Sequence, residues 1–81
     1  MQMREQQLKI LNHFQNDGEM LTVNLIRILF AILSPTARVA ELRKLGWDIR
    51  TNWTNEVDKF GGIHRVALYS YHGKKWDNAS V

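Results

Sequence analysis

The spacing of hydrophobic residues predicts a helix near the start of the chain. Apolar side chains recur every three or four positions between about residues 5 and 15, which is the pattern of a helix with one buried face. Residues 16–18, with the sequence Asn-Asp-Gly, then end the helix because these residue types favour turns. The expected buried face is formed by Leu8, Leu11 and Phe14, with Ile10 at its border.

A second helix is predicted over about residues 23–31. Thr22, which precedes it, has a side chain suited to an N-cap. Residues 19–21 form at most a very short strand before this cap. The apolar positions that we expect to face the core are Val23, Ile26, Leu29, Phe30 and Leu33.

The third predicted helix, about residues 35–45, has local signals at both ends. Ser34 can cap its first amides, and Pro35 suits the first helical position because that position needs no N–H. Gly46 can adopt the left-handed conformation that ends a helix. Helical spacing gives a buried side with Val39, Leu42 and Leu45, and a free side with Thr36, Ala37, Ala40, Arg43 and Lys44.

Two strands follow the helices. Apolar and polar residues alternate from Trp47 to Trp53, and Ile63 to Tyr71 is rich in β-branched and aromatic residues. Residues 55–62 join them and end in two glycines, so the pair is a hairpin with a long tip. Because a lone hairpin is only marginally stable, it must pack on the helices. The fold class is therefore α+β.

The length of 81 residues fits one domain, which we expect to span residues 1–73, with a flexible tail over residues 74–81. The chain has no cysteine, which excludes a disulfide framework and a thiolate zinc site. Its most apolar segment, residues 23–33, is shorter than the roughly 20 residues of a membrane span. Residues 1–7 lack the apolar run of a signal peptide. We therefore expect a cytoplasmic protein that does not bind membranes.

The formal net charge is +3, and its position matters more than its size. Basic side chains outnumber acidic ones in residues 35–50 and again in residues 72–81, while the other segments are close to neutral. The excess thus falls on the third helix, the strand after it and the tail. A basic stripe of this kind is typical of a protein that binds nucleic acid.

The segment from Arg38 to Ile49 resembles the winged helix-turn-helix DNA-binding domain, in particular the small type found in phages and prophages. Its Arg, aliphatic residue, two variable positions and Leu-Arg, followed by Gly-aromatic-x-Ile, match that family's pattern. Thr22, Ile32 and Tyr69 also match. Two positions depart from the family: Ala31 stands where a turn glycine is usual, and Ile26 stands where a small residue lets two helices approach. A wider spacing of the second and third helices is therefore expected.

The resemblance implies that the third helix enters the major groove of double-stranded DNA while the hairpin, or wing, touches the backbone or the minor groove. Arg43 and Lys44 are the leading contacts, and Thr36 suits a phosphate near the helix start. Arg38 either packs on the edge of the core or reads a base. The candidate DNA-contacting residues are Ser34, Thr36, Ala37, Arg38, Ala40, Arg43, Lys44, Arg50, Lys59 and Arg65.

The predicted wing is less basic than the third helix. Glu56 and Asp58 lie beside Lys59 near its tip, and carboxylates there oppose binding to phosphate. A second surface is predicted on the outer side of the second helix, where Leu25, Ile28 and Ile32 form an apolar patch. This patch, or the first helix, could mediate a homodimer that binds paired half-sites.

The residues give little support for an enzyme. His13, His64 and His72 lie in different predicted elements, so a metal site, a cofactor or a small-molecule substrate is not expected. The sequence predicts a small transcription regulator, or an accessory factor in excision or replication. The alternative is a winged-helix module that binds another protein and not DNA, which the acidic wing and the apolar second helix would both suit.

Overall fold

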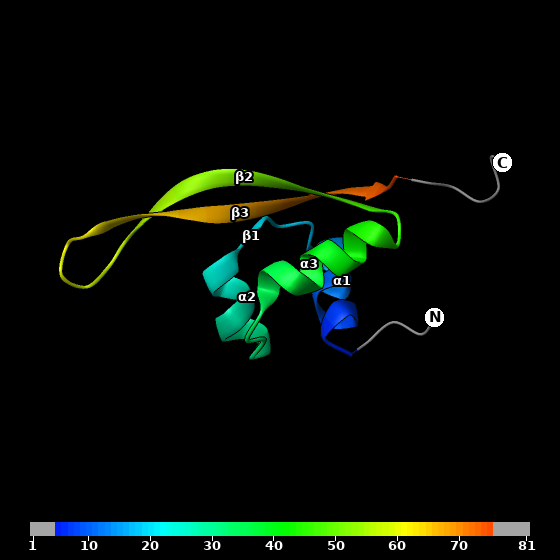
Figure 1. Ribbon diagram of the computed structural model, residues 1–81, viewed down its shortest axis with the longest axis horizontal. Coiled ribbons are helices and arrows are strands. Elements are labelled where there is room, and N and C mark those ends of the chain that lie inside the picture. The colour runs from blue at the N-terminus through cyan, green and yellow to red at the C-terminus, as the bar shows by residue number, and fades with distance from the viewer. Residues whose placement is uncertain (1–4, 76–81) are drawn as a thin grey trace, which may run out of the picture.

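The computed structural model describes residues 5–75 and confirms the α+β class (Figure 1). The three predicted helices and the hairpin are all present, and a two-residue strand precedes the second helix. The elements in chain order are α1 (Glu5–Asp17), β1 (Leu21–Thr22), α2 (Val23–Phe30), α3 (Pro35–Lys44), β2 (Trp47–Val57) and β3 (Ile63–Lys74).

The three strands form one antiparallel sheet in the order β1-β3-β2. The helices lie on one side of this sheet, and the loop end of the hairpin projects past them (Figure 1). Both long strands run further than predicted, to Val57 and to Lys74. At the other end, the Lys75 amide, two residues beyond the expected domain boundary at residue 73, donates to the Gly46 carbonyl at 2.6 Å. Residues 76–81 of the predicted tail lie outside the described part of the chain.

The core lies between the helices and the helix-facing side of the sheet. On α1 the buried positions are Gln7, Ile10, Leu11 and Phe14, whereas Leu8 is exposed. The buried face is thus displaced from the predicted one, because Gln7 enters the interior by donating to Glu41 of α3 at 2.7 Å. The remaining buried apolar residues are Leu21, Ile26, Ile32, Val39, Leu42, Ile49 and Tyr69.

The predicted helix starts are confirmed at two positions and wrong at a third. Thr22 caps α2, since its hydroxyl accepts from the Leu25 amide at 3.1 Å, and Pro35 occupies the start of α3. Ser34 precedes α3 but makes no side-chain cap, because its backbone has φ −125° and ψ 72°. Its carbonyl instead accepts from the Arg38 amide at 3.2 Å. At the other end, Gly46 is left-handed as predicted, with φ 101°.

Ala31 adopts the left-handed conformation of the turn glycine that it replaces, with φ 54° and ψ 38°. It therefore ends α2 at Phe30, and helical spacing no longer applies to the residues that follow. For this reason Ile32 is buried at 1 % exposure, whereas Leu33 is 89 % exposed. Leu29, which lies within α2, is also exposed. The prediction that Ile32 belongs to an exposed apolar patch is therefore wrong, and so is the prediction that Leu29 and Leu33 face the core.

Ala31→Gly is expected to raise the free energy of unfolding by about 0.5–1 kcal/mol. A left-handed residue with a side chain costs about 1 kcal/mol, which glycine avoids, although glycine also makes the unfolded chain more flexible. Urea unfolding followed by circular dichroism measures the change. The matched control is Ala40→Gly within α3, which should lower stability by about 1 kcal/mol. If both variants lost the same free energy of unfolding, the result would contradict a strained backbone at residue 31.

No single helix within residues 5–75 has the length and apolar character needed to cross a membrane. In this part of the chain, α2 and α3 counted together meet those two criteria, and they are bent by 100° relative to one another.

Candidate nucleic-acid interface

One side of α3 is exposed and carries no acidic residue. Thr36, Ala37, Ala40, Arg43 and Lys44 are all exposed there, while Val39 and Leu42 on the opposite side are buried. Glu41, the acid of this helix, is half-buried and accepts from Gln7 of α1. Ser34 lies exposed directly before the first turn. The free side of α3 therefore carries small side chains near its start and positively charged side chains at its C-terminal end.

Arg38 is held on the edge of the core. Its Nε lies 2.8 Å from Glu41 Oε1, and its Nη2 donates to Glu41 Oε2 at 3.1 Å. The remaining nitrogen donates to Gln6 of α1 at 3.3 Å. The guanidinium therefore lies between α1 and α3, where the Glu41 carboxylate balances its charge. Of the two roles predicted for Arg38, this position corresponds to packing on the edge of the core and not to reading a base.

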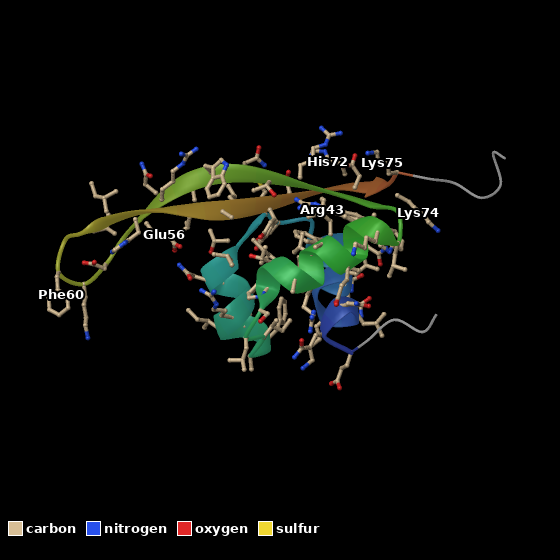
Figure 2. The ribbon with its side chains drawn as sticks, viewed as in Figure 1. Arg43, Glu56, Phe60, His72, Lys74 and Lys75 are labelled. Atoms are coloured by element: carbon tan, nitrogen blue, oxygen red, sulfur yellow. The ribbon has the colours of Figure 1, made fainter. Side chains whose placement is uncertain are left out.

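Arg43 connects the last turn of α3 to the base of the hairpin. Its Nε donates to the Ile49 carbonyl and its Nη2 to Thr51 Oγ1, each at 2.6 Å, and its guanidinium carbon lies 5.9 Å from the centre of the Tyr69 ring. Figure 2 shows this side chain between α3 and the sheet. Since both acceptors are uncharged, they orient the guanidinium without neutralising it. Thr36 adjoins the same ring, with 3.3 Å between Thr36 Oγ1 and the Tyr69 hydroxyl.

The end of β3 brings two lysines and a histidine close to the strand that follows α3. Lys74 lies on the helix side of the sheet, with its Nζ 5.4 Å from the centre of the Trp47 ring, while His72 and Lys75 lie on the other side (Figure 2). From the sequence, Lys74 and Lys75 were predicted to lie in a tail. The pairing of Trp47 with Lys74 between β2 and β3 instead places them at the end of the sheet, beside the start of β2.

Arg50 is exposed on β2 and forms an ion pair with Asp48, with 3.1 Å between Nη2 and Oδ2. The hydrogen bonds from Arg50 lower the pKa of Asp48 from its ordinary value, so the carboxylate stays charged well into the acid range. The cation of Arg50 is thus shared with a neighbouring acid, unlike that of Arg43.

The hairpin twists as it leaves the helices, so the side that faces them changes along its length. At its base, Ile49 and Tyr69 face the core. Further out, Glu56, which lies on the other face of the strand, turns to α2 and accepts from Asn24 at 2.8 Å (Figure 2). The opposite face of this outer half exposes Trp53, Val57 and Ile63, and Arg65 lies 4.8 Å from the Trp53 ring.

The carboxylate of Asp58 organises the loop at the tip of the hairpin. Oδ1 accepts from the amides of Phe60 at 2.9 Å and Gly62 at 2.8 Å, and Oδ2 lies 2.6 Å from His64 Nε2. The bond to His64, followed by those to the two amides, lowers the pKa of Asp58. Both wing acids that were expected to oppose phosphate therefore have partners within the protein.

The structure brings some of the predicted DNA contacts together and separates others. Thr36 and Arg43 lie against the base of the hairpin, and Ala37, Ala40 and Lys44 lie on the same exposed side of α3. Arg38 lies apart from that side, in its contact with α1. Lys59 and Arg65 lie on the outer hairpin, each near an aromatic ring. Within residues 5–75, no group of three histidine or acidic side chains could hold a metal ion.

The apolar surface on α2 differs from the predicted one. Ile28 is 77 % exposed and Leu25 is also exposed, but Ile32 belongs to the core. Leu29 and Leu33 are exposed as well, so they replace Ile32 in the apolar surface. We call the four exposed residues Leu25, Ile28, Leu29 and Leu33 the α2 patch.

Comparison with known proteins agrees with this architecture. The family model described as a winged helix-turn-helix domain matches residues 5–72, which include all three helices and almost the whole hairpin. No curated protein and no solved structure matches the chain. Domains of this family generally bind DNA. Since the match covers most of the sequence, the chain belongs to the winged helix-turn-helix family.

Proposed function

We propose that this protein binds double-stranded DNA by placing α3 in the major groove, and that it acts in the cytoplasm as a small transcription regulator or as an accessory factor in excision or replication. The observation that carries the proposal is the free side of α3. It is exposed, and its two cations, Arg43 and Lys44, have no acidic residue on the same side of the helix.

The arrangement of α3 suits close contact with a duplex. Ala37 and Ala40 are small, so the helix can approach the base edges, and an alanine methyl can touch the methyl group of thymine. Thr36 lies in the first turn, where backbone amides favour a phosphate. Arg43 is already oriented by Ile49 and Thr51, which lowers the entropy lost when it binds a phosphate or a guanine.

The cations outside α3 would bind phosphates on either side of the major groove. Lys74 lies on the helix side of the sheet, and Lys59 and Arg65 extend along the projecting hairpin. Arg50 would bind phosphate more weakly, because Asp48 already pairs with it. In this proposal the hairpin contributes to affinity and α3 contributes the reading of sequence.

A titration of a labelled random duplex at two salt concentrations tests this function. We expect binding at low salt that weakens steeply as salt rises, because each phosphate contact releases counterions and contributes about −0.9 to the slope of log K against log salt. No binding at low salt would contradict the proposal and favour a module for protein partners.

The α2 patch supports a homodimer as a further part of the proposal. Its residues are exposed around Ile28, on an element other than α3, so two copies could bind paired half-sites. The stoichiometry of the same titration distinguishes one bound copy from two, and Ile28→Glu should convert a complex of two copies into a complex of one.

A further inference from the structure

The tip of the hairpin displays a large aromatic ring that is exposed to solvent. Phe60 is 87 % exposed and lies at the end of the hairpin farthest from the helices (Figure 2). Behind it, Val57 and Ile63 form an exposed cross-strand pair. Single exposed apolar residues are common on proteins, but an exposed ring at the end of a projecting arm with a second apolar pair behind it suggests a surface that contacts a partner.

The loop that carries Phe60 is fixed by a compact set of hydrogen bonds. Besides the two amides bound by its carboxylate, Asp58 receives the Gly61 amide at its carbonyl at 3.0 Å and donates its own amide to Gly62 at 2.8 Å. Gly61 has a φ of 85°, which favours glycine. A Cβ on Gly62 would meet Asp58 Oδ2 at 2.7 Å, so a side chain there would displace the carboxylate that binds the loop amides. The Phe60 backbone is therefore held in one place.

The surroundings of the ring fit nucleic acid better than another protein. The Nζ of Lys59 lies 5.6 Å from the ring centre, and Arg65 is the next cation along the arm. The Asp58 carboxylate is turned toward His64 and the loop amides, and the two glycines add no side chains beside the ring. A single apolar wedge next to a cation is the combination that proteins use to enter the minor groove and separate a base step.

The length of the arm allows this contact while α3 occupies the neighbouring major groove. From Leu68, which pairs with Thr22 of β1, the strand runs five residues out to Ile63. At about 3.4 Å per residue this is about 17 Å, which is half of one helical turn of about 34 Å and therefore about the distance between adjacent major and minor grooves.

We propose that Phe60 inserts between two base pairs from the minor groove and kinks the duplex. This inference rests on the proposed DNA binding and adds a deformation of the DNA to it. Lys59 binds a phosphate beside the kink, and Val57 and Ile63 contact the sugars that line the groove. The preferred sites are pyrimidine–purine steps, which unstack most easily.

The test uses the full chain and a duplex of about 30 base pairs with several TA and CA/TG steps, labelled at both ends for energy transfer. Wild-type protein is expected to shorten the distance between the labels. Phe60→Ala should remove this shortening and weaken binding about tenfold, as expected for the loss of one base-stacking contact. Phe60→Tyr keeps a ring and should retain both effects.

The matched control is Met20→Ala, because Met20 is also an exposed apolar residue, at 56 %, but lies before β1 and outside α3, the hairpin and the α2 patch. It should leave affinity and bending unchanged. Wild-type binding without shortening, or Phe60→Ala that still bends the duplex, contradicts the insertion while leaving DNA binding in place. A Phe60→Ala variant that changes sedimentation of the free protein indicates a contact between copies instead and also contradicts it. Absence of any wild-type binding contradicts both proposals.

Discussion

Replacing Arg43 and Lys44 together by alanine is expected to weaken binding to duplex DNA about a hundredfold or more. Arg43 is the oriented guanidinium at the junction of α3 and the hairpin, and a good contact from arginine to guanine is worth about 1–3 kcal/mol. Loss of two phosphate-binding cations should also lower the salt slope by nearly two. Fluorescence anisotropy at several salt concentrations measures both quantities.

The controls for this variant must distinguish the loss of positive charge from a loss of folding stability, because Arg43 also binds the base of β2. Lys44→Ala alone keeps the bonds to Ile49 and Thr51, and it should lose about one unit of salt slope with unchanged stability. Glu56→Gln retains an acceptor for Asn24 and should not weaken binding. A folded double variant that binds DNA with wild-type affinity and slope would remove the basis for assigning α3 to the major groove.

Phe14→Ala is expected to bring the domain close to unfolding. The side chain is 1 % exposed and stacks on Tyr71 with 5.7 Å between ring centres, so its loss leaves a cavity between α1 and the sheet. Such a change costs about 3–5 kcal/mol, whereas a chain of this size has about 4–12 kcal/mol of stability in all. Urea unfolding followed by tryptophan fluorescence measures the loss.

Leu33→Ala is the comparison for this second variant. Leu33 is almost fully exposed, so removal of its side chain should change stability by less than about 0.5 kcal/mol. Similar losses for the two variants would show that the contact of α1 with the sheet contributes little, contrary to the burial of Phe14.

The features that were predicted correctly from sequence depend on neighbouring residues. Thr22 as a cap, Pro35 at a helix start and Gly46 in a left-handed turn each follow from the chemistry of one residue and its immediate neighbours. The free side of α3 was also predicted correctly, because the helix is regular from Pro35 to Lys44. Leu45 was predicted to be on the buried side, but it follows the last helical residue and is 36 % exposed.

The errors come from contacts between distant residues or from a break in periodicity. Helical spacing was extended across Ala31, where the helix has already ended, and this reversed the assignments of Ile32 and Leu33. Gln7 is buried because Glu41, far away in sequence, accepts its hydrogen bond. The lengths of the strands were underestimated because residues 55–57 were interpreted as part of the connecting loop and His72-Gly73 as the end of the domain. Both segments instead pair across the hairpin.

The orientation of the acidic side chains of the wing could not be read from composition either. Glu56 and Asp58 count as two acids in the sequence, but one contacts Asn24 of α2 and the other binds the amides of its own loop. The direction in which a carboxylate points depends on the twist of the hairpin and on the geometry of the tip, and neither is specified by the residues at those positions alone.

The bonds from Arg43 to Ile49 and Thr51 also affect which nucleic acids the protein can accommodate. They hold the last turn of α3 against the base of the hairpin, so the helix and the ribbon meet a duplex as one rigid unit. B-form DNA has a major groove about 12 Å wide, which admits a helix, whereas in double-stranded RNA this groove is too narrow for side chains to read. In the proposed binding mode, a spacing fixed inside the protein would favour DNA over RNA before any base is contacted.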